Sequence, residues 1–114
     1  MNVKSKIVDD ILYVMLSGEL DEHTSNYTKN CLEEIFNSNK FNKVVLDFAE
    51  LEFMDSTGIG VLLGRYKKLN KNNKRIFISN PSNTIEKIFK MSGIYEIMPK
   101  ISWGEVWSIV MKWV

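Results

Sequence analysis

Short apolar runs of strand length alternate along this chain with amphipathic segments of helical period. Residues 3–8 alternate loosely between polar and apolar side chains, and residues 11–16 form a continuous apolar run. The two segments flank an Asp-Asp pair that favours a turn, which predicts a β-hairpin. Two later runs, residues 44–48 and 76–78, have little polar alternation and are typical of strands covered on both faces. Because strands alternate with single helices, we expect an α/β fold with a small mixed, mostly parallel sheet of four to five strands, an N-terminal hairpin and about four packed helices.

Three segments carry apolar residues at spacings of three and four, which predicts amphipathic helices. Asp21 or Thr24 is expected to cap the first helix, and Gly93 is expected to end the third. A fourth helix is predicted to run from the capping-box pair Ser102 and Glu105 to the C-terminus. The inward-facing positions expected in the first three helices are Tyr27, Cys31, Leu32, Ile35, Phe36, Ile59, Leu62, Leu63, Tyr66, Leu69, Ile85, Ile88 and Phe89.

Length and charge bound the class of protein. A chain of 114 residues has room for one domain, so residues 1–114 are expected to form a single domain. The net charge of +1 produces no strong long-range field, and no apolar stretch reaches the roughly 18 residues of a membrane span. We therefore expect neither nucleic acid nor a membrane as partner. The single cysteine, Cys31, has no intramolecular disulfide partner, and the N-terminus shows no leader pattern, which indicates the cytoplasm.

The most informative segment is residues 53–60, Phe-Met-Asp-Ser-Thr-Gly-Ile-Gly, between a predicted buried strand and a predicted helix. A helix N-terminus presents free backbone N–H groups and the positive end of the dipole, so a phosphate attached there is stabilised. Asp55 is expected to orient the neighbouring hydroxyl. Two interpretations remain open on local grounds: Ser56 is a modification site, or Ser56 or Thr57 is only the N-cap of the helix.

Enzymatic interpretations of this segment lack the residues they need. An aspartic protease needs two carboxylates, and the strand-to-helix setting argues against one. The dinucleotide fingerprint is not met because Gly64 comes one place late, and Gly60 and Gly64 are instead expected to let the helix lie close to the sheet. His23 is the single histidine and is accompanied by no nucleophile elbow and no metal-ligating cluster. We expect no catalytic residue, no metal and no cofactor.

Two further patterns lie outside this segment. Residues 65–75 carry six basic and no acidic side chains, which a solvated helix end explains because four acids in residues 47–55 offset them. The C-terminal helix has only a narrow polar stripe. A patch around Trp113 is a candidate for weak self-association of a protein that we otherwise expect to be a monomer.

Four segments, in order along the chain, form one recognisable set. They are Gly18-Glu19-Leu20-Asp21, Val45-Leu46-Asp47, the stretch from Phe53 to Tyr66, and the stretch from Phe89 to Gly93. With them the chain resembles the anti-sigma factor antagonists of the STAS family, and among these the sporulation-type members. The resemblance spans nearly the whole chain and is weakest after about Pro99.

The resemblance implies a partner-switching cycle. The unmodified antagonist binds an anti-sigma factor, which is also an ATP-dependent serine kinase, and a sigma factor is released for transcription. Ser56 matches the serine that the kinase phosphorylates to end binding, and a PP2C-type phosphatase reverses the step. Thr57 stands where relatives often have a second serine. The expected partner-binding residues are Gly18, Glu19, Asp21, Asp55, Ser56, Thr57, Gly58 and Ile59.

Three alternatives remain open at this point. An antagonist serving the general stress response differs in partner identity, which genome neighbours would decide. A passive scaffold subunit of a larger STAS assembly predicts stable oligomers that phosphorylation does not dissociate. From a different class, a small serine hydrolase or nucleotide-binding enzyme predicts ester hydrolysis or nucleotide binding.

Overall fold

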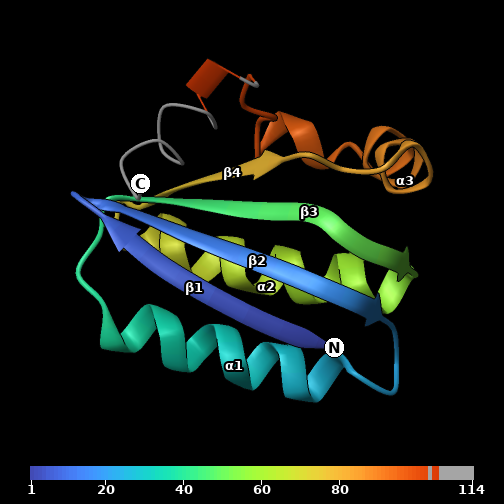
Figure 1. Ribbon diagram of the computed structural model, residues 1–114, viewed down its shortest axis with the longest axis horizontal. Coiled ribbons are helices and arrows are strands. Elements are labelled where there is room, and N and C mark those ends of the chain that lie inside the picture. Colours follow the sequence, from blue (N-terminus) through green and yellow to red (C-terminus); the bar gives the residue numbers. More distant parts are fainter. Residues whose placement is uncertain (103, 106–114) are drawn as a thin grey trace.

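The computed structural model describes residues 1–102, 104 and 105, and it is built around a four-stranded sheet with strand order β1-β2-β3-β4 (Figure 1). The strands are β1 (Asn2–Val8), β2 (Ile11–Leu20), β3 (Lys43–Met54) and β4 (Arg75–Ser79). The helices are α1 (Ser25–Ser38), α2 (Ser56–Lys71) and α3 (Asn83–Ser92), followed by a 3₁₀ turn at Ile94–Glu96. β1 pairs antiparallel with β2, whereas β2, β3 and β4 are mutually parallel, which confirms the predicted mixed α/β sheet.

The described residues contain fewer elements than the upper end of the prediction. There are four strands and three α-helices in this part of the chain, against four to five strands and about four helices expected. In place of a fifth strand, Lys100 forms an isolated parallel bridge with Ile78. The helix predicted from Ser102 to the C-terminus, with the self-association patch at Trp113, lies almost wholly outside the described residues. At its start the Glu105 N–H donates to Ser102 Oγ at 3.2 Å.

The N-terminal hairpin forms as predicted but its second strand is longer. Asp9 adopts a positive φ of 57° in the turn, and the pairing runs from Asn2 with Ser17 to Val8 with Ile11. β2 continues to Leu20 because its far end pairs with β3. Gly18 and Glu19 therefore lie in this strand, beyond the apolar run of residues 11–16 from which the strand was predicted.

β3 lies in the interior of the sheet, with β2 and β4 on either side. Its residues 44–48 are all buried, as the absence of polar alternation predicted. β3 extends well beyond the predicted run of residues 44–48, to Met54. Glu50 and Glu52 are exposed there, so their polarity reflects the solvent side of a strand and not a break in it.

The helices cover the sheet as Figure 1 shows, with α1 and α2 on one side of it and α3 beyond the carboxyl end of β4. Leu32 of α1 and Leu62 of α2 are fully buried in the same core cluster as Leu46 of β3. The rings of Phe48 in β3 and Phe89 in α3 meet edge to face, with centroids 5.0 Å apart. This packing fixes the N-termini of α2 and α3 at the end of the sheet where the carboxyl ends of the parallel strands β2, β3 and β4 lie.

Several helix positions differ from the predicted inward faces. Tyr27 is 55 % exposed and Cys31 is half-buried, whereas Thr28 takes the inward place on α1 and donates to the Thr24 carbonyl at 2.9 Å. Arg65 of α2 is buried, so the assignment of the whole basic stretch to a solvated helix end is wrong at this residue. The helical period predicts a face, but which edge of that face is inward depends on the neighbouring element.

Candidate functional site

The segment with Ser56 lies where β3 passes into α2, and Asp55 is the N-cap of that helix. Asp55 has extended backbone angles, and its Oδ1 accepts a hydrogen bond from the Gly58 N–H at 3.1 Å. Ser56 is the first helical residue, and both Ser56 and Thr57 are exposed. The interpretation of Ser56 or Thr57 as only the N-cap is therefore wrong, because Asp55 has that role and the Ser56 hydroxyl is left accessible.

The position of Ser56 suits an attached anion. The first N–H groups of a helix have no partner within the helix. Here the Asp55 side chain accepts from one of them, that of Gly58, while the Asp55 carbonyl accepts the first bond of the helix ladder, from the Ile59 N–H. The first turn of α2 holds no acidic residue. A phosphate on Ser56 would meet the positive end of the helix dipole within the first turn.

The end of β2 lies directly against the start of α2. The Asp55 N–H donates to the Leu20 carbonyl at 3.3 Å. A Cβ placed on Gly58 would lie 2.6 Å from Met54 Cγ and 3.0 Å from the Leu20 carbonyl oxygen, so only glycine fits. Gly60 and Gly64 have open space instead, and the expectation that they bring α2 close to the sheet is wrong.

The loop after β2 is shaped by Asp21. Its Oδ1 accepts from the N–H groups of His23 at 2.9 Å and Thr24 at 3.1 Å. Thr24 Oγ1 in turn donates to the Glu19 carbonyl at 2.8 Å and accepts from the Asp21 N–H at 3.1 Å. These bonds hold the turn into α1, while the Glu19 side chain stays exposed. Asp21 therefore stabilises the loop, whereas the carboxylate of Glu19 is exposed to solvent.

Gly18 has a structural role beside this loop. Its φ is +105°, and a Cβ at this position would lie 3.3 Å from Met1 Cα. Glycine therefore allows the irregular pairing between β2 and β3 and the close approach of the N-terminus. Among the expected partner-binding residues, Gly18 and Gly58 serve the backbone, whereas Glu19, Ser56 and Thr57 are exposed and Ile59 is partly buried.

A shallow apolar hollow of about 370 Å³ adjoins Ser56. Its lining residues are Met54, Asp55, Ser56, Ile59, Ile88, Met91 and Ser92. Met91 is 89 % exposed on the rim, at a position where a surface helix normally carries a polar side chain. The contribution of α3 was not predicted from the sequence, and this exposed methionine was the signal that could have indicated it. We call Ser56, Thr57, Glu19 and this hollow the docking face.

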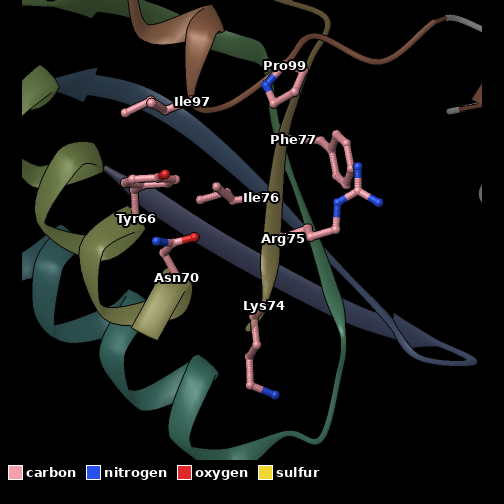
Figure 2. A pocket seen from close by; sticks show the side chains of 8 residues that line it. All are labelled: Tyr66, Asn70, Lys74, Arg75, Ile76, Phe77, Ile97 and Pro99. Carbon is pink, nitrogen blue, oxygen red and sulfur yellow. The ribbon is translucent and has the colours of Figure 1, made fainter. Parts of the chain in front are cut away.

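A different hollow of about 220 Å³ lies beside β4, and none of its lining residues lines the hollow next to Ser56 (Figure 2). Tyr66 and Asn70 of α2 face Ile76 there, whereas the Arg75 guanidinium lies beside the Phe77 ring, with its central carbon 5.2 Å from the ring centroid. The hollow brings no acid, base and nucleophile together. We assign it no role.

In the part of the chain that the structure describes, His23 lies at the surface and the potential metal ligands do not cluster. The His23 side chain is 83 % exposed in the loop before α1, and its Nδ1 is 3.9 Å from Asp21 Oδ1. No group of three or more His, Cys, Asp and Glu side chains gathers in residues 1–102, 104 and 105 in a way that could hold a metal ion. No helix in this part of the chain has the length and apolar character of a membrane span.

Comparison with known proteins shows the family to which this chain belongs. The STAS domain model matches residues 2–105. The chain belongs to the STAS domain family. It is 38 % identical over 89 residues to the anti-sigma F factor antagonist of Paenibacillus polymyxa, and this alignment covers 78 % of this chain and 76 % of that one. It is 33 % identical over 101 residues to the anti-sigma-B factor antagonist of Staphylococcus epidermidis, covering 86 % and 90 %.

Solved structures show the same STAS fold. The unphosphorylated form of the anti-sigma factor antagonist SpoIIAA superposes with a TM-score of 0.76 at 28 % identity, covering 97 % of each chain. The phosphorylated form of the Bacillus cell fate determinant SpoIIAA superposes with a TM-score of 0.69, covering 96 % of this chain and 99 % of that one. The predicted resemblance to STAS anti-sigma factor antagonists is confirmed. The names of these relatives describe regulators and not enzymes.

Proposed function

We propose that this STAS domain is an anti-sigma factor antagonist whose unphosphorylated form binds an anti-sigma factor with serine kinase activity, and that phosphorylation of Ser56 ends this binding. Binding would free a sigma factor for transcription, and a PP2C-type phosphatase would restore the active form. The names of the relatives support the antagonist role. The single observation that carries the switch is the exposed Ser56 hydroxyl at the first position of α2, with Asp55 as the cap.

The fold is expected to survive phosphorylation. A phosphate adds roughly −1.5 to −2 charges, and at the start of α2 these charges meet unpaired N–H groups and the positive dipole end. Asp55 is close, but its carboxylate is already engaged with the Gly58 N–H. The capping bond and the contact of Asp55 with Leu20 therefore remain in place.

Binding is lost because the docking face is apolar next to Ser56. The hollow formed with Ile59, Ile88 and Met91 is suited to an apolar side chain of the anti-sigma factor. A dianion at its edge would have to be desolvated against such a partner, which costs several kcal/mol. A penalty of about 3 kcal/mol weakens binding on the order of a hundredfold, which is enough for a switch.

The proposal is tested by incubating the protein with its cognate kinase and ATP and locating the modified residue by mass spectrometry. We expect a single phosphate on Ser56. Ser56→Ala should remain unmodified, and Thr57→Ala is the matched control that should still be modified. Modification of Thr57 in the wild-type protein, or no modification at all, would contradict the proposal.

A second candidate is an antagonist of the general stress response. The observation that favours it is the similarity to the anti-sigma-B factor antagonist over more of the chain than the anti-sigma F alignment covers. The docking chemistry is the same in both cases, so the partner decides. Measuring the affinity of the unmodified protein for each of the organism's own anti-sigma factors distinguishes them.

Two further alternatives make different predictions. A scaffold subunit of a larger STAS assembly would form stable oligomers, and phosphorylation would not dissociate its complexes; light scattering before and after the kinase reaction tests this. A serine hydrolase or nucleotide-binding enzyme would turn over generic esters or bind nucleotide at the docking face. Ester assays and nucleotide titration, each with Ser56→Ala as control, test that class.

A further inference from the structure

A hollow of about 290 Å³ lies between the C-terminal halves of α1 and α2, apart from the docking face. Along α2, Arg65 follows Ser56 by nine residues, which corresponds to about 14 Å along the helix axis. The polar residues that line the hollow are Glu33, Asn37, Arg65, Lys68, Asn72 and Lys74. Nothing in the proposed switch uses this set of side chains.

Arg65 is the unusual member of the set. Its side chain is 9 % exposed, and its Nη1 lies 3.1 Å from Glu33 Oε1. The approach forms no hydrogen bond, so the buried Nε and Nη1 atoms have no hydrogen-bond partner among the described residues. Buried charged groups are normally both paired and fully hydrogen-bonded, because an unsatisfied charge is costly. The guanidinium is thus under-compensated by the protein itself.

The carboxylate of Glu33 does not balance the local charge. The same Glu33 oxygen also accepts a hydrogen bond from Lys68 Nζ at 3.1 Å. Lys74, a third cation, lies with its Nζ 4.4 Å from the centroid of the Phe41 ring and donates to the Phe41 carbonyl. The lining of the hollow therefore holds three cations and one carboxylate. The C-terminal dipoles of two helices contribute about half a negative charge each, which leaves the hollow positive.

We propose that this hollow binds a phosphate-class oxyanion, either free phosphate or the phosphate group of a nucleotide. Lys68 and Lys74 would supply charge-assisted hydrogen bonds, and the Asn37 and Asn72 amides would add neutral donors. The buried guanidinium of Arg65 supplies fixed positive charge in a site of low dielectric, where it acts more strongly than in water. The site is independent of the proposed switch at Ser56.

The test is an NMR titration of the full chain with sodium phosphate at constant ionic strength, with sodium chloride as the reference. We expect saturable shifts at the Arg65 Nε–H and at the Asn37 and Asn72 side-chain amides. Because Arg65 is buried and its replacement risks unfolding, the test variant is Lys74→Met, which keeps the aliphatic contact with Phe41. Lys71→Met changes the net charge equally but lies outside the lining, so it is the matched control.

Loss of one charge-assisted contact should weaken phosphate binding about five- to tenfold in Lys74→Met and less than about twofold in Lys71→Met. Equal weakening in both variants, or no saturable shift up to about 20 mM phosphate, would overturn the proposal. ADP is titrated as a second arm. Tighter binding of ADP with shifts centred on the hollow identifies a nucleotide as the source, and equal or weaker binding identifies free phosphate. ADP shifts confined to other residues, without a phosphate response in the hollow, overturn it.

Discussion

Replacement of Gly58 by alanine is expected to destabilise the protein, whereas the same replacement at Gly60 is expected to stabilise it. Both glycines lie in α2, where alanine is the better helix former by about 1 kcal/mol. At Gly60 nothing lies within 4 Å of the added Cβ, so this gain should appear almost in full. At Gly58 the Cβ would lie 2.6 Å from Met54 Cγ, 2.9 Å from Leu20 Cγ and 3.0 Å from the Leu20 carbonyl oxygen.

The magnitude at Gly58 follows from these contacts. The methionine and leucine side chains can shift, but the Leu20 carbonyl is part of β2 and accepts from the Asp55 N–H. Overpacking of this kind costs about 1–3 kcal/mol. After the helix-propensity gain is subtracted, Gly58→Ala should lose up to about 2 kcal/mol, while Gly60→Ala gains up to about 1 kcal/mol.

Urea denaturation followed by circular dichroism measures both changes, with thermal unfolding as a second readout. One kcal/mol corresponds to a shift of roughly 4–8 °C in the midpoint of thermal unfolding for a domain of about this size. If Gly58→Ala is as stable as Gly60→Ala, the inference that α2 lies too close to the end of β2 for a Cβ at position 58 is wrong. If both variants lose stability equally, the inference that a Cβ at position 60 meets open space is wrong.

Three further predictions concern the docking face and the acid stability of the fold. Ser56→Ala should keep binding of the anti-sigma factor and Ser56→Asp should bind poorly, as measured by isothermal titration calorimetry; equal affinities would refute the electrostatic account of the switch. Asp55→Ala should lose about 1 kcal/mol of stability in urea because the N-cap is removed, whereas Asp55→Asn, which can still accept from the Gly58 N–H, should lose much less. The pKa of Glu86 is lowered from 4.5, first by its hydrogen bond from Lys100 and also by one from Tyr95. The ionised Glu86 side chain therefore stabilises the fold above pH 4.5, and this stabilisation is lost as the pH falls through the lower folded-state pKa. Melting temperatures between about pH 6 and pH 3 should therefore fall less steeply in Glu86→Gln than in the wild-type protein, and parallel curves would contradict this assignment.

Much of the candidate site could be predicted from local sequence because its key residues are neighbours in the chain. Asp55, Ser56 and Gly58 lie within one turn, and a polar segment between a buried strand and an amphipathic helix predicts a helix N-terminus. Which of the polar residues is the cap was open, since Asp, Ser and Thr all have the chemistry for it. In the structure Asp55 is the cap, because its backbone angles are extended and its side chain accepts from the Gly58 N–H.

The rest of the docking face could not be predicted in this way. Met91 follows Ser56 by 35 positions, and no spacing rule connects the start of α2 with the end of α3. The length of β2 was missed for a similar reason, because its second half is stabilised by β3 and not by its hairpin partner. Strand pairing across the chain depends on which segments become neighbours.

Local patterns along the chain are enough to predict the alternation of strands and helices, the hairpin, the covered β3 and the place of Ser56 at a strand-to-helix junction, because periods of 2 and 3.6 and capping chemistry act between residues close in the chain. Contacts between elements establish that Gly58 and not Gly60 is the tight glycine, that Arg65 is buried while Tyr27 is exposed, and that α3 completes the surface beside Ser56. These outcomes depend on which atoms of one element meet which atoms of another. Packing of that kind is set by the distances between elements, about which a periodic pattern in a single segment carries no information.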